Sequence, residues 1–383
     1  NNPLNFLMLN TNFSIKPINE ETTNSFIFTI NTTKGTGNSF NLPLREGYNY
    51  DFVVDWGDST TSTVSSFDDV NKSHTYSTGG EYQIKISGIC ESISFLMNND
   101  SSKLISIDQW GYTGFIDMSG AFFSCNNLTS VYDNNSDWSS NVTTMNGMFY
   151  QCGNLSYINL SNWDVSNVSN MGGLFYRCGK LTNLDVSNWN VSSVTNMGGM
   201  FYECVLLENL DLSSWDTSNV TNMTGMFNGC SQLNVVGLNN WNIQNVQYMA
   251  NILNGVILDT NYYDSIIIAW AIQTVQNNVI FDANLSKRSV DSCDAYNTLV
   301  DTYNWNISDN SSSTMCISSL EIVYNSIENK IMYVVSIPYE GTNANIEITP
   351  SGGGTTQIIP IIVENYHSSG EYSIVLSPGL YDV

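Results

Sequence analysis

The sequence predicts a mixed fold in which a repeat solenoid, built from a parallel sheet and short helices, is flanked by all-β sandwiches. The first observation is a pattern that recurs about five times between residues 118 and 253, with tryptophans spaced 25, 26, 26 and 26 residues apart. The second is that cysteine, valine and methionine columns keep the same period, and the third is that the flanking segments alternate as strands do. A period of roughly 20–50 residues indicates stacked units that cannot bury their apolar faces alone. The two clearest columns are Trp138, Trp163, Trp189, Trp215 and Trp241, and Cys125, Cys152, Cys178, Cys204 and Cys230.

One repeat, residues 181–204, shows what each unit is expected to form. Leu181, Leu184 and Val186 follow an L-x-x-L-x-L pattern, which indicates a short strand with alternate side chains on one side. The cap-type segment 192–196 precedes apolar residues at 194, 197, 200, 201 and 204, which share one face of a helix. The pair Gly198-Gly199 weakens this helix by about 1 kcal/mol per glycine, so we expect it to be short or partly 3₁₀.

The repeat also resembles a known family. Residues 155–178 and 207–230 follow L-x-x-L-x-L-S-N-W-D-V-S-N-V-T-N-M-x-x-M-F-x-x-C almost letter for letter. This pattern resembles the leucine-rich repeats of BspA-like surface proteins, over about 200 of the 383 residues. The resemblance implies a curved solenoid and a surface-exposed interaction role, and it names no ligand.

Four domains are predicted along the chain. Residues 1–90 alternate as strands and carry W-G-D, H-x-Y and G-x-Y-x-I signals, at 56–58, 74–76 and 80–84, which resemble a PKD-like, immunoglobulin-like sandwich. Residues 91–254 are the solenoid, with a degenerate first turn around Trp110. Residues 255–312 are similar to the C-terminal α/β cap of BspA-like proteins, with helices at 262–275 and 290–303, strands at 279–281 and 305–307, and Ile266, Ile267 and Trp270 over the end of the ladder. Residues 313–383 predict an immunoglobulin- or fibronectin-like sandwich that is cut off within a strand.

Composition restricts the class of partner. Eleven basic residues stand against 35 acidic ones, and the net charge of −24 disfavours nucleic acid and anionic membrane as partners. No run of apolar residues is long enough for a membrane-spanning helix. The chain begins with Asn1 and no basic segment precedes it, so we expect either a removed signal peptide or a piece of a longer protein.

The eight cysteines do not predict a disulfide framework. Five of them occupy one column of the repeat, where a small buried thiol packs as an apolar group, so we expect free thiols there. Cys90, Cys293 and Cys316 lie outside the column, and a bridge between Cys293 and Cys316 stays open. No C-x-x-C pair predicts a zinc site.

Catalytic signals are few, and we predict that the chain is not an enzyme. The two histidines and the absence of the usual nucleophile, phosphate-loop and metalloprotease motifs disfavour most enzyme classes, including a glycosidase. His74 is interpreted as a structural turn or packing residue. We expect no cofactor or metal. Calcium stays open because Asp55, Asp58 and residues 68–69 lie in acidic loops, although no Asp-x-Asp-x-Asp-Gly pattern supports a calcium site.

The predicted interaction surface, which we call the strand face, consists of the x positions of L-x-x-L-x-L, because these side chains point away from the core. We expect ligand binding at Tyr132, Tyr157, Asn159, Asn183, Asp185, Asn209 and Asp211, with Thr129, Ser130, Ser156, Thr182, Glu208, Asn234, Val235 and Gly237 around them. A second column, Phe123, Tyr150, Tyr176 and Tyr202, is interpreted as packing between neighbouring helices in preference to a binding stripe.

These features predict a non-enzymatic extracellular protein for adhesion or recognition on a bacterial cell surface. Its expected partners are host-cell or matrix proteins or glycans, and neighbouring copies of the chain are a further candidate partner. The alternative is the same architecture on a virus particle, as a fibre, decoration or receptor-binding protein.

Overall fold

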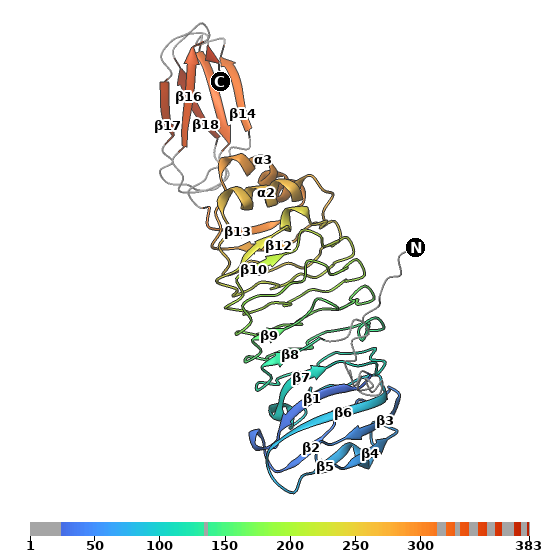
Figure 1. Cartoon of the computed structure of the whole chain (residues 1–383). Helices are drawn as coiled ribbons and strands as arrows, with labels where there is room; N and C mark the ends of the chain where they lie inside the picture. The colour runs from blue at the N-terminus through green and yellow to red at the C-terminus, as the bar shows by residue number, and fades with distance from the viewer. Residues whose placement is uncertain are drawn as a thin grey trace, which may run out of the picture.

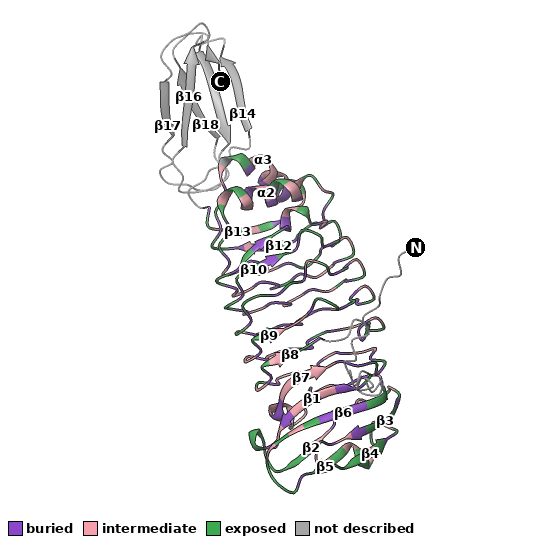
Figure 2. Ribbon diagram, in the orientation of Figure 1, coloured by how far each residue is buried: buried purple, intermediate pink, exposed green. Residues whose placement is uncertain are grey.

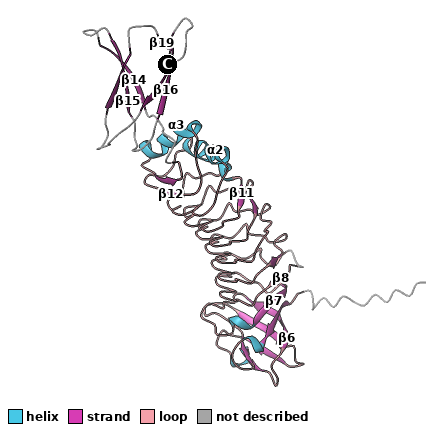
Figure 3. Cartoon of the chain, turned by 90° about the vertical axis from the view of Figure 1, so that its left-hand side faces the viewer, coloured by secondary structure: helices cyan, strands magenta, loops and turns pink. Residues whose placement is uncertain are grey.

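The computed structural model describes residues 24–133 and 137–311, together with the backbones of six strands between residues 319 and 382. Figure 1 shows strands at the N-terminal end, a long stack of chain turns in the middle, and the helices α2 and α3 beyond the stack. Figure 3 shows the same succession from the side. The stack contains the residues of the predicted strand face, so its geometry decides where their side chains lie.

The strands of the N-terminal part do not form a separate sandwich. β1 (Phe26–Asn31) pairs antiparallel with both β6 (Glu81–Cys90) and β7 (Leu104–Gln109). Its side chains alternate between buried and half-buried, as the alternating sequence predicts. One seven-stranded sheet results, in the order β4-β3-β6-β1-β7-β8-β9, in which β3 is Tyr50–Asp55, β4 Thr61–Val64, β8 Ser130–Val131 and β9 Tyr157–Ile158. A small second sheet pairs β2 (Ser39–Asn41) with β5 (Ser73–Thr75).

Beyond β7 the chain turns are held to one another by hydrogen bonds between residues about 26 positions apart. Parallel bridges join Asn170 to Asn196 and Asn196 to Asn222, within a column that runs from Ser92 to Tyr248. In a second column, β8 pairs in parallel with β7 and β9, and further along the stack Asn183 bridges to β10 (Asn209–Asp211), which pairs with β11 (Asn234–Val236). The strands in this second column are two or three residues long after β7, so the parallel sheet is fragmentary.

The short helices predicted for each repeat are absent between residues 117 and 237, within the described part of the chain. In residues 197–204 the N–H groups of Gly199, Phe201 and Glu203 donate to the next turn, at 2.7–2.9 Å, and those between them donate three residues back. Gly199 and Glu203 have φ of 62° and 52°, which an α-helix cannot contain. The spacing of three or four between apolar residues is therefore produced by consecutive tight turns and not by a helix.

The predicted fold class is wrong. The structure is mostly β, has few helices, and contains one mixed seven-stranded sheet that continues from the N-terminal strands into the first turns of the stack. A solenoid of parallel sheet and helices between independent immunoglobulin-like sandwiches does not describe it. Residue 90 is not a boundary between independent parts, because β6 and β7 both pair with β1 across that position.

The columns of the repeat form one continuous core, seen as buried ribbon along the stack in Figure 2. The column tryptophans are 0–5% exposed, and methionine, phenylalanine and leucine columns are buried beside them. The five column cysteines are buried free thiols, as predicted, and Cys90, for which no state was predicted, is a buried free thiol as well. From Cys152 onward, each thiol donates to the carbonyl of a phenylalanine about 29 residues earlier, for example Cys204 Sγ to Phe175 O at 3.1 Å.

The end of the stack is covered by α2 (Thr260–Ala271), which overlaps the helix predicted for this segment. Asp259 begins it by accepting hydrogen bonds from the N–H groups of Asn261 and Tyr262. Trp270 is buried and its Nε1 donates to Leu238 O at 3.0 Å, beside the last column tryptophan. β12 (Ile280–Ala283) pairs with β13 (Asn306–Asp309), and between them lie the 3₁₀ turn η5 (Val290–Ser292), α3 (Cys293–Asn297) and the π-turn η6 (Thr298–Thr302).

Cys293 in α3 is disulfide-bonded. Cys316, the partner that the sequence left open, lies outside the described residues. The remaining 3₁₀ turns are η1 (Thr32–Lys34), η2 (Val70–Lys72), η3 (Ser101–Lys103) and η4 (Leu238–Asn240).

The described C-terminal strands lie in the segment for which an immunoglobulin- or fibronectin-like sandwich was predicted. Their described backbones form two separate three-stranded sheets, β14-β15-β18 and β17-β16-β19. The strands are β14 (Ser319–Asn325), β15 (Lys330–Ser336), β16 (Ala344–Pro350), β17 (Gln357–Ile361), β18 (Glu371–Leu376) and β19 (Tyr381–Asp382).

Candidate binding surfaces of the repeat stack

The predicted ligand residues of the strand face gather in two places. At the β8–β9 end, Tyr132 and Tyr157 are 45% and 49% exposed, and their ring centroids lie 5.3 Å apart with planes tilted by 42°. Tyrosine at an exposed surface offers an apolar ring and a hydrogen-bonding hydroxyl at low entropic cost. This pair is an aromatic contact point at one end of the strand face.

The second place is a cavity of about 310 Å³ further along the stack. It brings together four of the predicted residues, Asn183, Asp185, Asn209 and Asp211, and its remaining lining is Leu184, Val186 and Ser187. The two asparagines lie side by side, since Asn183 forms a parallel bridge with Asn209. The exposed amides can donate hydrogen bonds to a polar partner and accept them from it, and the exposed carboxylates can accept them.

Three of the predicted ligand residues also hold their own turns. Oδ1 of Asn159, Asp185 and Asp211 accepts a hydrogen bond from the serine N–H two residues on, at 3.0–3.2 Å. Hydrogen bonds from the Ser213 hydroxyl and N–H lower the pKa of the exposed Asp211 carboxyl. Asparagine and aspartate are thus interchangeable for the turn, whereas only aspartate adds charge to the surface.

Two outward positions were assigned wrongly. Val235 is 1% exposed and Gly237 is buried, whereas the sequence pattern placed both on the strand face. The register of β10 with β11 pairs Leu210 with Val235, a step of 25 residues, although Leu207 to Leu233 and Leu212 to Leu238 keep the step of 26. The one-residue shift is therefore confined to β11, where it turns the side chains to the other side of the strand.

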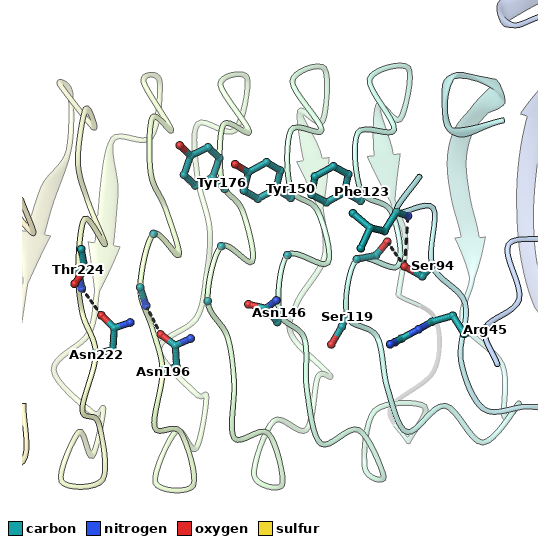
Figure 4. Close-up of a pocket in the computed structure, with 17 residues that line it drawn as sticks. Arg45, Ser94, Ser119, Phe123, Asn146, Tyr150, Tyr176, Asn196, Asn222 and Thr224 are labelled. Carbon is teal, nitrogen blue, oxygen red and sulfur yellow. Dashed lines mark hydrogen bonds between the residues drawn. The ribbon is translucent and has the colours of Figure 1, made fainter. Parts of the chain in front are cut away.

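A larger hollow, which we call the tyrosine groove, shares no residue with the strand-face cavity. It has a volume of about 530 Å³ and crosses several turns of the stack (Figure 4). Phe123, Tyr150 and Tyr176 form one side; the other lining residues are Arg45, Ser94, Leu96, Ser119, Gly120, Asn146, Gly147, Gly172, Gly173, Asn196, Gly198, Gly199, Asn222 and Thr224. Volumes of about 300–1,000 Å³ are typical of ligand sites.

The aromatic side of the groove is a stack of parallel rings. Phe123 lies 4.7 Å from Tyr150, Tyr150 lies 4.3 Å from Tyr176, and Tyr202 continues the stack at 4.4 Å. Burial and the neighbouring Tyr150 hydroxyl raise the pKa of Tyr176 to about 12. The ring faces pack against one another, as the packing interpretation required, although between tight turns and not between helices. Their edges are left to line the groove, because a Cβ added at Gly173 would lie 3.3 Å from Tyr150 Cδ2.

Glycine opens the floor of the groove. One column of the repeat holds Ser119, Asn146, Gly172, Gly198 and Thr224, so side chains stand at both ends and none in the middle. Gly172 and Gly198 do not have positive φ, so their backbone does not require glycine. The open floor is visible in the sequence as a missing side chain. Two repeats have Gly-Gly at this place, where the other repeats have Ser-Gly, Asn-Gly or Thr-Gly. The columns that predicted the core do not include this place, so the groove was not predicted.

His74 and the acidic loops lie in the N-terminal part and hold its turns. His74 stacks on Trp56 at 5.0 Å, and its Nε2 lies 2.8 Å from Asp58 Oδ2. Burial raises the pKa of the Asp58 carboxyl, but hydrogen bonds from Thr60 and His74 outweigh it and the pKa is lowered. Among the described residues, no three His, Cys, Asp or Glu side chains are grouped so that they could hold a metal ion.

None of the helices in the described part of the chain is long and apolar enough to cross a membrane.

Comparison with known proteins gives one family. No curated protein and no solved structure matches the chain. A family described as Mycoplasma proteins of unknown function, DUF285, matches residues 91–208 and 180–296, which is more than half of the chain. The match covers the stack and begins after β6, and nothing in it supports the PKD-like resemblance of residues 1–90. The chain belongs to this DUF285 family, whose BspA-like relationship agrees with the repeat pattern.

Proposed function

We propose that this chain is a non-enzymatic recognition protein that acts in adhesion on a bacterial cell surface and binds protein or glycan partners through the strand face. The observation that carries the proposal is the exposed tyrosine pair, Tyr132 and Tyr157, in line with a cavity lined by exposed amides and carboxylates. Surfaces of this composition suit hydrogen-bonded contacts with a polar partner.

The charge of the chain narrows the choice of partner. A net charge of −24 repels polyanions over the whole molecule, and Asp185 and Asp211 place carboxylates in the strand-face cavity. We therefore expect partners that are neutral or basic at the contact, such as a basic patch of a matrix protein.

The test is binding of the purified, fluorescently labelled chain to intact animal cells and to immobilised extracellular-matrix proteins. The strand-face variant combines Tyr132→Ala, Tyr157→Ala, Asp185→Asn and Asp211→Asn. Asparagine keeps the Oδ1 acceptor that holds each turn, as Asn159 does, so the variant changes the surface and leaves the turns in place.

The matched control is Asp164→Asn with Asp216→Asn. These aspartates hold turns in the same way, through the N–H groups of Ser166 and Ser218, and they lie outside the strand face. We expect the strand-face variant to lose at least tenfold in affinity and the control to bind as the unchanged chain does. Equal loss in both variants, or no binding by the folded chain, would contradict the proposal.

A further inference from the structure

We propose that the tyrosine groove is a second binding site and that its ligand is a neutral oligosaccharide lying across the turns of the stack. The site lies on other residues than the strand face, so the inference goes beyond the proposed function and does not depend on it. The first ground is size, because about 530 Å³ of open space lies between a row of aromatic residues and a row of polar ones.

The second ground is that the backbone of the floor is already hydrogen-bonded. Gly147 N donates to Gly172 O and Gly173 N to Gly198 O, both at 2.8 Å. Gly172 N and Gly198 N donate to the Oδ1 atoms of Asn170 and Asn196, at 2.9 and 3.0 Å. An extended peptide that adds a strand needs unpaired backbone groups at a sheet edge. The floor offers none of these, so recognition has to come from side chains.

The third ground is the chemistry of those side chains. Asn146, Asn196 and Asn222 carry amides, Ser119 and Thr224 carry hydroxyls, and the tyrosines add phenolic hydroxyls. Figure 4 shows the asparagines and the aromatic rings on opposite sides of the open floor. Amides and hydroxyls both donate and accept, which matches the hydroxyl groups of a sugar, each of which does the same.

The fourth ground is charge. Arg45 is the one charged residue that lines the groove, and its Nη1 lies 2.9 Å from Asp117 Oδ2. Burial raises the pKa of the Asp117 carboxyl, but hydrogen bonds from Tyr48 and Ser119 and the charge of Arg45 lower it, and the net shift is downward. Asp117 is therefore ionised at neutral pH and compensates Arg45, which leaves a groove without net charge.

The last ground is repetition. Neighbouring aromatic rings are 4.3–4.7 Å apart, and the polar side chains of the opposite row come from several turns of the stack. A linear oligosaccharide presents similar hydroxyl groups once per sugar ring, at a comparable spacing. The aromatic faces are stacked on one another, so they are not free to form an apolar pocket. A peptide would need such a pocket for an anchoring side chain, so the groove disfavours a peptide ligand.

The experiment is a glycan array probed with the purified chain, followed by calorimetric titration of the best ligands. The array holds linear neutral oligomers of glucose, galactose and N-acetylglucosamine, together with sialylated and sulfated counterparts. We expect binding to at least one neutral oligomer of three or more rings and weaker binding to its charged counterparts.

Two variants locate that binding. Gly198→Thr copies Thr224 of the next repeat into the open floor, where the atoms nearest to its Cβ would be Asn222 Nδ2 and Asn196 Oδ1, at 3.1 and 3.2 Å. Its matched control is Gly179→Thr, also a glycine of the stack without positive φ, whose nearest new contact is Val205 Cγ2 at 3.7 Å. The second variant, Tyr150→Phe with Tyr176→Phe, copies Phe123 and removes hydroxyls without removing rings.

We expect Gly198→Thr and the double Phe variant each to weaken neutral-oligosaccharide binding at least tenfold. Gly179→Thr and the strand-face variant should leave it unchanged. The inference is overturned if the folded chain binds only charged glycans or none, if an extended peptide competes for the site, or if binding survives in both groove variants. If Gly198→Thr fails to fold, the double Phe variant decides the question.

Discussion

The indole of Trp189 lies in the middle of the stack, 4% exposed and 6.2 Å from the ring of Trp163. Its Nε1 is buried without a hydrogen-bond partner, whereas Nε1 of Trp215 donates to Val186 O at 3.0 Å. Column tryptophans thus contribute through packing, and at position 189 the polar atom brings no compensating hydrogen bond.

We predict that Trp189→Ala lowers the free energy of unfolding by about 3–5 kcal/mol, because it empties a large volume inside a continuous core. Trp189→Phe should cost clearly less, since it keeps a ring and removes the unpaired N–H. Urea denaturation followed by circular dichroism measures both. Equal stability of Trp189→Ala and the unchanged chain would mean that the column is not the core.

The buried thiols make a second prediction at this scale. Burial raises the pKa of Cys230 from its usual 9 to about 12, and it raises the pKa values of Cys125 and Cys178 well above 9. Folding therefore favours the protonated thiols. Below pH 9 they do not reduce the free energy of unfolding, which falls as the pH rises from 9 toward 12. Iodoacetamide at pH 8 should leave these cysteines unmodified in the native chain and modify them in guanidinium. Rapid modification of the native chain would contradict their burial.

At the scale of single residues, the sequence alone predicts which side chains are buried. The tryptophan, methionine and cysteine columns were identifiable because they repeat in register over five units. The tyrosine groove could not be identified from columns of this kind, because it results from a side chain that two repeats lack. A missing side chain is visible only once the neighbouring turns are known to stack around it.

At the scale of the element, the tight turns of residues 197–204 replace a predicted helix. Helical spacing and consecutive three- and four-residue turns place apolar residues at similar intervals, so the sequence pattern alone does not separate them. The deciding feature is the recurring left-handed residue, for example Gly147, Gly173 and Gly199, each with φ between 61° and 63°. In a helical interpretation of the sequence, these glycines count only as a cost to the helix.

We predict that Gly199→Ala destabilises the chain by about 1–2 kcal/mol, the usual cost of a left-handed conformation for an L-residue. Its new Cβ would also approach Tyr176 Cδ2 to 3.3 Å. Gly179→Ala is the control, because that glycine has no positive φ and open space around it. Thermal unfolding of the two variants compares them, and equal melting temperatures would contradict the turn description.

At the scale of the whole molecule, the seven-stranded sheet joins the N-terminal strands to the first turns of the stack. β1 lies between β6 and β7, and its residues Phe28 and Ile30 are buried. The sequence showed strands before residue 90 and repeats after it, but not that they share a sheet. Strand pairing across a predicted boundary depends on long-range contacts that local patterns do not encode.

We predict that a chain beginning at residue 91 is less stable than the full chain and aggregates, because it leaves the edge of β7 unpaired and the buried face of Ile107 uncovered. Size-exclusion chromatography and thermal unfolding of the shortened and full chains test this. A soluble monomer of undiminished melting temperature would show that the two parts are independent.

The measurement that tests the central claim most directly is cell binding by a variant that combines the strand-face changes with Tyr150→Phe and Tyr176→Phe. The claim is that surface side chains of the stack carry recognition, and the combined variant alters both surfaces while it keeps the rings and turns that hold the fold. We predict a native circular dichroism spectrum with binding to cells reduced to background. Undiminished binding by the folded variant would place recognition outside the stack and contradict the claim.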